Sequence, residues 1–335
     1  MIVRCNDIEL DTKHFDGNLD KKKINEVREN FYKGFTKDKA IRQLENLIQK
    51  GKGRQNFVHG YYFEKIANDG ILHHSKFSIN QMLDSDELIQ VFINKSSLNS
   101  KVFDSSDLTT NVKTSIRLGG KGIVAKLTNF PIKECVEILK NNTAPDSKVY
   151  LDPCSGWGVR MIASAHLGLN YIGFDVNSAL VEKLNELGND IRKIKPDWNF
   201  KIFTRGSQYH IESCDNRADI IFTSPPYFNL ENYNNNELEK EDSISDTYEH
   251  WLESFVRPML KNCLRYKNGS DSKVCMNVKG FKDYDIVNDF IRIGTDVGLD
   301  FIELQDLKNN TRVHGGHGIT YAGIVDNNEQ IIVFK

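Results

Sequence analysis

The sequence predicts an α/β protein in which a mostly parallel, doubly wound sheet follows a mainly helical N-terminal region. Its 335 residues are enough for about two domains. Apolar residues make up 39% and charged residues 27%, the composition of a globular chain with a sizeable core. From about residue 117, short apolar segments alternate with amphipathic ones, as in a parallel sheet covered by helices on both faces. We therefore expect a helical domain over residues 1–110, a candidate recognition domain, and the sheet domain over 111–335.

The N-terminal region shows helical periodicity in three stretches, at residues 39–50, 55–68 and 79–93. The first is the clearest, because its apolar residues recur at helical spacing and Gly51 follows as a stop signal. Residues 94–107 are rich in Ser, Asn and Asp, so we expect an exposed linker there.

The second part of the chain contains short apolar segments that predict strands and longer amphipathic ones that predict helices. The predicted strands cover residues 149–151, 171–174, 201–203, 219–222, 273–278 and 330–335. The predicted helices cover residues 159–167, 178–187, 248–264 and 286–297. Ligands bind such sheets at the carboxyl ends of the strands, so the loops after the first and fourth strands are candidate sites.

Cysteine and histidine usage argues against a metal site and against a secreted disulfide framework. The six cysteines lie far apart and none forms a C-x-x-C pair, which favours free thiols in a reducing compartment. The close histidine pairs, His73–His74 and His314–His317, lack a third ligand nearby, so no metal is expected. No apolar stretch approaches the ~20 residues of a membrane helix, and the N-terminus has no apolar signal region. These features predict a cytoplasmic protein without a membrane partner.

Charge is unevenly distributed along the chain, although the net charge is only −2. From Lys21 to Arg54, eleven Lys or Arg residues stand against four acids, whereas residues 231–253 contain eight acids and one Lys. A basic segment with interleaved aromatic residues such as Phe31 and Tyr32 favours contact with phosphates and unstacked bases. A solvated helix face with aromatic residues in the core explains the same pattern, and the sequence leaves both interpretations open. On the first, the nucleic-acid contacts include Lys21, Lys22, Lys23 and Arg54.

The loop after the first predicted strand has the features of a cofactor site. It reads DPCSGWG at Asp152–Gly158, and Gly156 and Gly158 allow a tight turn and close approach of the backbone to a ligand. Asp175 ends the second predicted strand, where a carboxylate can accept hydrogen bonds from ribose hydroxyls. The pattern predicts an adenosine-containing cofactor. Met161 stands where the dinucleotide fingerprint has its third glycine, which argues against NAD.

The loop after the fourth predicted strand has the features of a catalytic site for an amine. It reads SPPY at Ser224–Tyr227 and is followed by Phe228. Pro225 and Pro226 fix two φ angles and keep the preceding residues extended, so the loop is stiff before a ligand arrives. A serine oxygen and a peptide carbonyl held together can accept both hydrogens of an exocyclic NH2 group. The rings of Tyr227 and Phe228 offer flat faces on which a flipped base can stack.

Together these loops resemble the amino-methyltransferases of DNA, which are class I S-adenosylmethionine enzymes. Their cofactor motif is typically D-P-F-x-G-x-G and their catalytic motif (D/N/S)-P-P-(Y/F/W), and the likeness covers roughly residues 117–335. The resemblance implies a Rossmann-like class I methyltransferase fold and S-adenosylmethionine as the cofactor. It also implies that double-stranded DNA is the partner, and that the amine of a flipped base attacks the sulfonium methyl directly.

The resemblance assigns roles to individual residues. The implied catalytic residues are Ser224, Pro225, Pro226 and Tyr227. The implied cofactor-binding residues are Lys126, Asn129, Phe130, Asp152, Cys154, Ser155, Gly156, Gly158, Asp175 and Ser207. The family often has an acid after the third strand that meets the adenine amino group. This chain has Thr204–Gln208 there instead, with Ser207 or Gln208 as the replacement.

The resemblance leaves the substrate open between several classes. Ser224 favours cytosine N4 over adenine N6, whereas related loops in RNA enzymes make an RNA amino-methyltransferase an alternative. A non-catalytic nucleic-acid-binding protein that keeps the fold is the third. Pro153-Cys154 matches the nucleophile of carbon-5 cytosine methyltransferases but follows the wrong strand, so that class is rejected. The two motifs lie too close together to enclose a large recognition domain. Sequence selectivity is therefore expected to come from residues 1–110 or 231–246, or to be low.

Overall fold

The chain forms two compact units in the computed structural model, and each is described by itself. The described residues are 2–5, 8–12, 14–72, 75–97, 107–119, 123–124, 129–226, 228, 231–232, 247–279, 284–306 and 329–335. The helical unit comprises Met1–Gln43, Asn56–Asn129 and Asn229–Glu239. The sheet unit comprises Leu44–Gln55, Phe130–Phe228 and Lys240–Lys335.

The helical unit consists of short helices with small antiparallel strand pairs, β1 with β2 and β3 with β8. Its elements are β1 (Ile2–Cys5), β2 (Ile8–Asp11), α1 (Lys21–Asn30), α3 (Gln55–Tyr62), α4 (Glu64–Ala67), β3 (Ile71–Leu72), α5 (Ile79–Asp84), α6 (Asp86–Ser97), α7 (Leu108–Gly119) and β8 (Glu231–Asn232). Helix α2 (Lys37–Lys50) belongs to it as far as Gln43. Apolar side chains of α1, α6 and α7, such as Val27, Phe92 and Val112, form its core. The mainly helical character predicted for the N-terminal region is confirmed.

One predicted helix of this unit is split in two. The sequence pattern predicts a single helix over residues 79–93, but α5 ends at Asp84 and α6 begins at Asp86. Ser85 between them is extended, with φ −104° and ψ 120°, and its hydroxyl accepts a hydrogen bond from Leu88 N at 3.2 Å. Ser85 therefore caps α6, a position that serine favours.

The sheet unit contains a seven-stranded sheet in the order β10-β11-β9-β7-β4-β5-β6. Its strands are β4 (Val149–Asp152), β5 (Asn170–Asp175), β6 (Phe200–Thr204), β7 (Ile220–Thr223), β9 (Lys273–Lys279), β10 (Phe301–Asp306) and β11 (Glu329–Phe334). The strands from β6 to β9 pair in parallel, and β11 runs antiparallel to both of its neighbours. The predicted fold class is confirmed as a Rossmann-like α/β fold with a mostly parallel sheet.

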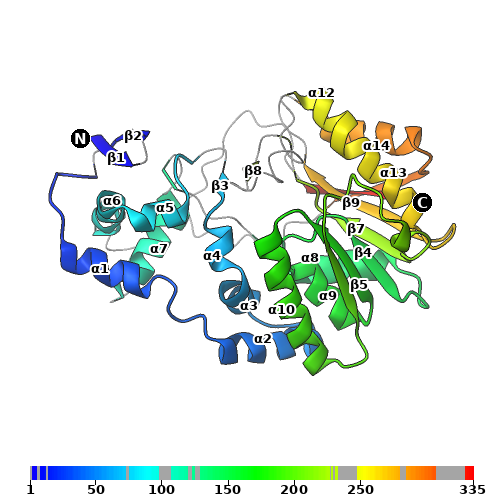
Figure 1. Cartoon of the computed structure of the whole chain (residues 1–335), viewed down its shortest axis with the longest axis horizontal. Helices are drawn as coiled ribbons and strands as arrows, with labels where there is room; N and C mark the ends of the chain where they lie inside the picture. Colours follow the sequence, from blue (N-terminus) through cyan, green and yellow to red (C-terminus); the bar gives the residue numbers. More distant parts are fainter. Residues whose placement is uncertain are drawn as a thin grey trace. The chain divides into compact units, whose positions relative to one another are not determined.

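Helices cover the sheet, and all residues of β7 are buried, as in a strand covered on both faces. The helices of the unit include α8 (Ile132–Asn142), α9 (Val159–Leu167), α10 (Ser178–Ile194), α12 (Tyr248–Trp251), α13 (Arg257–Tyr266) and α14 (Ile286–Asp296), with a π-helical turn, η2 (Leu252–Val256), joining α12 to α13. Figure 1 shows α12, α13 and α14 grouped together in yellow and orange, while α8 packs against α9. None of the described helices is long and apolar enough to cross a membrane.

The limits of the two units differ from the division expected after residue 110. Helix α7 packs against α1 and α6, so it belongs with the helices that precede it. Residues Leu44–Gln55 belong instead to the sheet unit, where the His166 ring forms a hydrogen bond with the Ile48 carbonyl oxygen at 2.8 Å. Packing between helices, rather than the polar composition of residues 94–107, sets the division.

Candidate active site

The two loops singled out by their sequence leave neighbouring strands. β4 and β7 pair in parallel, with Leu151 opposite Ile221. Their carboxyl ends therefore meet at one edge of the sheet, where ligands of such folds bind. Asp152 and Thr223, which begin the two loops, are 71 positions apart in the sequence and are hydrogen-bonded in the fold. Strand order thus brings the two predicted sites together.

The glycine loop adopts the backbone conformation that its glycines allow. Gly156 and Gly158 have φ of 53° and 73°, in the left-handed region that side chains disfavour, and Gly158 begins α9. The Gly156 N–H donates to Asp175 Oδ2 at 3.2 Å. Asp175 and the loop therefore meet, although a whole helix separates them in the sequence.

Asp175 is a partly buried acceptor at the end of β5. Its Oδ1 also accepts a hydrogen bond from Asn177 N at 3.1 Å. Burial raises the pKa of Asp175 to about 6, although its two backbone N–H donors act in the opposite direction. The carboxylate is therefore mostly ionised at pH 7, as an acceptor for ligand hydroxyls must be.

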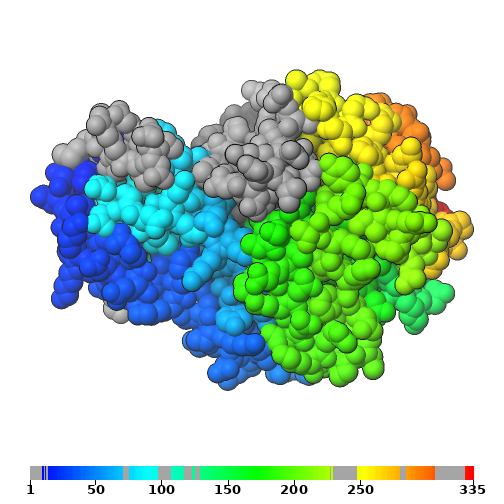
Figure 2. Space-filling model, in the orientation of Figure 1, coloured from blue at the N-terminus to red at the C-terminus, as the bar shows by residue number. Residues whose placement is uncertain are grey.

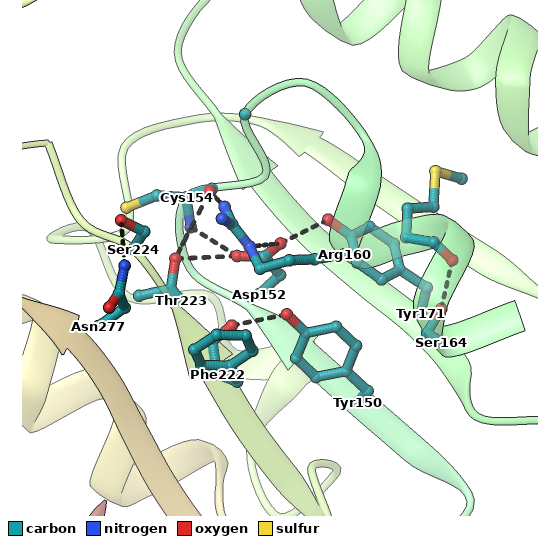
Figure 3. A network of polar contacts seen from close by, with 12 residues as sticks. Tyr150, Asp152, Cys154, Arg160, Ser164, Tyr171, Phe222, Thr223, Ser224 and Asn277 are labelled. Atoms are coloured by element: carbon teal, nitrogen blue, oxygen red, sulfur yellow. Dashed lines mark hydrogen bonds and ion pairs between the residues drawn. The ribbon is translucent and has the colours of Figure 1, made fainter. Parts of the chain in front are cut away.

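Asp152 is completely buried at the centre of a polar network (Figure 3). Its Oδ1 accepts hydrogen bonds from Thr223 Oγ1 at 2.9 Å and from Cys154 N at 3.3 Å. Its Oδ2 accepts from Arg160 Nε at 2.8 Å and from the Tyr171 hydroxyl at 3.0 Å. These protein donors use the roughly four lone-pair positions of a carboxylate. The Asp152 side chain therefore holds the loop together, and its predicted contact with the cofactor stays a prediction.

Arg160, which the sequence analysis did not identify, braces the same loop. Its side chain is only 8% exposed, and its Nη2 donates to the Cys154 carbonyl oxygen in addition to the ion pair with Asp152. A buried guanidinium requires such partners, since an unpaired buried charge is costly. The feature of the sequence that could have indicated Arg160 is that it is one charged residue within the otherwise apolar start of α9.

Ser224 follows β7 directly and is half-buried. Its Oγ accepts a hydrogen bond from Asn277 Nδ2 at 3.3 Å, and Asn277 lies in β9 with 2% of its surface exposed. Because Asn277 is the donor, Ser224 Oγ keeps a second lone pair for another donor. Pro225 is buried and Pro226 half-buried. Asn277 was not among the predicted site residues, and its signal in the sequence was one amide side chain in an apolar strand.

Phe228 lies in an aromatic cluster of the sheet unit. It is 8% exposed, and its ring contacts those of Tyr248, Trp251 and Tyr284 at centroid distances of 5.7, 6.2 and 5.5 Å. The Phe228 ring therefore packs in the apolar core, and its predicted stacking against a base stays a prediction.

The turn after β6 approaches the glycine loop. Ser207 Oγ lies 3.8 Å from Cys154 Sγ, and Asn262 Nδ2 donates to the carbonyl oxygens of Ser207 and Gln208, both at 3.0 Å. Gln208 Oε1 is buried and accepts no hydrogen bond from the part of the chain that the structure describes. An unsatisfied buried acceptor is costly, so this oxygen marks a position suited to a donor group of a ligand.

The segment before α8 is held by a side chain from residues Leu44–Gln55. Gln55 Nε2 donates to the Phe130 carbonyl oxygen at 3.1 Å, and Gln55 Oε1 accepts from Ile132 N at 2.8 Å. The Phe130 ring packs against Phe222 of β7, with centroids 6.0 Å apart. The predicted cofactor residue Phe130 is therefore fixed next to the strand that leads to Ser224.

For three other predicted site residues, no contacts within the sheet unit can be given. Tyr227 and Lys126 lie outside the described residues, and Asn129 ends the helical unit. The stacking role of Tyr227 and the cofactor contacts of Lys126 and Asn129 stay predictions.

The basic segment consists of exposed charges over buried apolar side chains. Lys21 and Lys23 are exposed and form ion pairs with acidic neighbours, and Lys22 and Arg54 are exposed as well. Helices α1 and α2, in blue, form part of the surface on the face shown in Figure 2. Phe31 is only 2% exposed, as the alternative of a solvated helix face with aromatic residues in the core expects. Contact of the charges with phosphates stays a prediction.

Several solved structures are similar to about 60% of the chain. A TehB-like SAM-dependent methyltransferase from Corynebacterium glutamicum is 13% identical, with a TM-score of 0.38, over 60% of this chain and 86% of that one. A putative RNA methyltransferase from Pyrococcus horikoshii is 17% identical, with a TM-score of 0.37, over 61% and 82%. The magnesium protoporphyrin IX methyltransferase from Synechocystis, with bound SAM, is 10% identical, with a TM-score of 0.38, over 61% and 76%. No family model and no curated protein matches the sequence.

Proposed function

We propose that this protein is an S-adenosylmethionine-dependent methyltransferase that modifies an exocyclic amine of a DNA base. The observation that carries the proposal is the position of the glycine loop and the SPPY loop on the adjacent strands β4 and β7. The two loops are in direct contact, because Cys154 N donates to Thr223 Oγ1 at 3.1 Å. A loop suited to a nucleoside cofactor and a loop suited to an amine therefore leave the sheet at one point.

The side chains around the glycine loop fit S-adenosylmethionine. Asp175 offers an ionised carboxylate to the ribose hydroxyls, and Gly156 permits close approach of the backbone. Gln208 Oε1 is a buried acceptor without a partner among the described residues, as the adenine amino group requires. When bound, S-adenosylmethionine supplies an electrophilic methyl group.

Ser224 and the Pro225 carbonyl are suited to hold the amine that receives the methyl group. Asn277 fixes the Ser224 hydroxyl by donating to its Oγ, which leaves a lone pair for an amine hydrogen. Pro226 has no N–H, and the two prolines keep the loop stiff, so the acceptors need little reordering when a base arrives. Two acceptors that bind both amine hydrogens leave the nitrogen lone pair directed outward, and positioning of this kind accelerates transfer.

Cys154 is unsuited to the nucleophilic role that carbon-5 methylation of cytosine requires. Burial raises the pKa of its thiol to about 12, so the thiol is protonated at neutral pH. Direct transfer to an amine needs no thiolate.

The resemblance of Ser224 to the serine of cytosine enzymes favours cytosine N4 over adenine N6 as the acceptor.

The experiment is methyl transfer from labelled S-adenosylmethionine to mixed-sequence duplex DNA and, in parallel, to total tRNA. Nucleosides from both are separated by mass spectrometry against N4-methylcytosine and N6-methyladenine standards. We expect label in DNA that depends on Ser224, so the Ser224→Ala variant is the matched control. Label in tRNA alone would replace the DNA assignment by an RNA one. Bound cofactor without transfer to either would overturn the proposal.

A further inference from the structure

Thr223 connects the two loops of the proposed site, and we infer that it is the positioning residue that holds the cofactor loop in register with the catalytic loop. The inference rests on the proposed function, because it assigns a role within the same site. It concerns a side chain that lies beneath the loops rather than one expected to contact cofactor or base.

The contacts of Thr223 reach both loops. Thr223 ends β7, is completely buried and is followed directly by Ser224. Its Oγ1 donates to Asp152 Oδ1 at 2.9 Å and accepts from Cys154 N at 3.1 Å. One hydroxyl therefore binds a side chain and a backbone group of the cofactor loop, while the backbone of the same residue continues into the catalytic loop.

Arg160 also binds the backbone of Cys154, through the carbonyl oxygen rather than the N–H. Thr223 holds the N–H of Cys154, and Arg160 holds its carbonyl oxygen. Arg160 and Thr223 also meet at the same carboxylate, and Figure 3 shows both side chains directed toward Asp152. Because Asp152, Thr223 and Arg160 are buried and hydrogen-bonded to one another or to Cys154, the network resists local displacement.

These contacts predict that losing the Thr223 hydroxyl affects ligand affinity, unlike the loss of an ordinary buried hydroxyl. Loss of an ordinary one lowers the stability of the fold and leaves ligand affinity unchanged wherever the protein remains folded. Loss of the Thr223 hydroxyl removes the shorter of the two hydrogen bonds made by the Cys154 N–H and one donor to Asp152, which loosens the cofactor loop. Cofactor affinity should therefore fall, even though Thr223 belongs to the strand that leads to the SPPY loop. Its neighbour Ser224 should behave differently, since its hydroxyl faces Asn277 rather than the cofactor loop.

The test compares Thr223→Val, which preserves shape but removes both polar contacts, with Thr223→Ser, which retains them. Calorimetry measures the affinity for S-adenosylhomocysteine at a temperature where circular dichroism shows each variant folded, and labelled S-adenosylmethionine with duplex DNA measures kcat. Ser164→Ala is the matched control, because the Ser164 hydroxyl is completely buried and donates to the Met161 carbonyl oxygen in its own helix at 2.7 Å.

We expect Thr223→Val to weaken binding roughly tenfold and to lower kcat, and Thr223→Ser to restore both to within about threefold. Ser224→Ala should lower kcat with unchanged affinity, and Ser164→Ala should lower only the melting temperature. Wild-type affinity in folded Thr223→Val would overturn the inference. If that variant does not fold, Thr223→Ala removes the same contacts and is judged in the same way. A wild-type protein that binds no S-adenosylhomocysteine would overturn the proposed cofactor, and this inference with it.

Discussion

Cofactor affinity should fall as the pH drops below about 6, because Asp175 then takes up a proton. Burial raises the pKa of Asp175 from 3.8 to about 6. A protonated carboxyl is a weaker acceptor for the ribose hydroxyls than a carboxylate. With this pKa, roughly one-tenth of Asp175 is ionised at pH 5, so affinity for S-adenosylhomocysteine should be about tenfold lower there than at pH 7.5.

The stability of the free protein should respond to Asp175 in the opposite direction. The pKa of this carboxyl is higher in the folded state than in the unfolded chain, so the folded state binds more protons between about pH 4 and 6. The contribution of Asp175 to the free energy of unfolding therefore rises as the pH falls through that window. Weaker binding at pH 5 is then not a consequence of unfolding driven by Asp175.

Calorimetric titration with S-adenosylhomocysteine from pH 5 to 8 measures the effect, with Asp175→Asn as the control. Asparagine keeps the shape but does not titrate, so any protonation of the ligand itself appears equally in both proteins. We expect the variant to bind more weakly at pH 7.5, by about 1–3 kcal/mol, and to lack the wild-type decline below pH 6. Parallel curves for the two proteins would refute the assignment of Asp175 to the cofactor.

Three other features of the chain lead to measurable effects. Ser224→Ala should slow single-turnover transfer by roughly 100-fold or more with an unchanged dissociation constant for S-adenosylhomocysteine, because its contact matters chiefly in the transition state; an unchanged rate would remove Ser224 from catalysis. Gln208→Leu should weaken cofactor binding by about 1–3 kcal/mol in calorimetry, whereas Gln208→Glu keeps the acceptor; equal affinity of all three proteins would exclude Gln208. Replacing Lys21, Lys22 and Lys23 by Ala should flatten the dependence of DNA affinity on salt, measured by fluorescence anisotropy. An unchanged slope would assign these lysines to a solvated face.

Local signals were sufficient to predict most elements of the sheet unit. The predicted helix over residues 159–167 is found as α9 with the same bounds, because an αL glycine precedes it and another follows it. The ends of strands β4, β5, β7 and β9 lie within one residue of the predicted ends. Short apolar runs bounded by glycine, proline and acidic residues are properties of the chain itself, and they need no tertiary information to be read.

Among the elements of the sheet unit that escaped prediction are a largely exposed strand and a π-helical turn. Strand β10 lies at the edge of the sheet, and Phe301, Ile302 and Leu304 are 40%, 48% and 41% exposed. Without a fully buried face, its sequence carries little contrast between apolar and polar positions. The π-helical turn η2 within the predicted helix over residues 248–264 likewise has no sequence pattern that distinguishes it from the α-helical turns beside it.

Local patterns are enough to locate the glycine loop and the SPPY loop along the chain, because glycine, proline and strand ends act over a few neighbouring positions. Which polar groups meet depends on how the strands and helices pack. In the fold, Asp152 is a buried acceptor for Arg160 and Thr223. Ser224 accepts a hydrogen bond from Asn277, and Phe228 lies in the core. The partners of these groups come from strands and helices up to 71 positions away. Burial and pairing depend on strand order and helix packing, which no local pattern specifies.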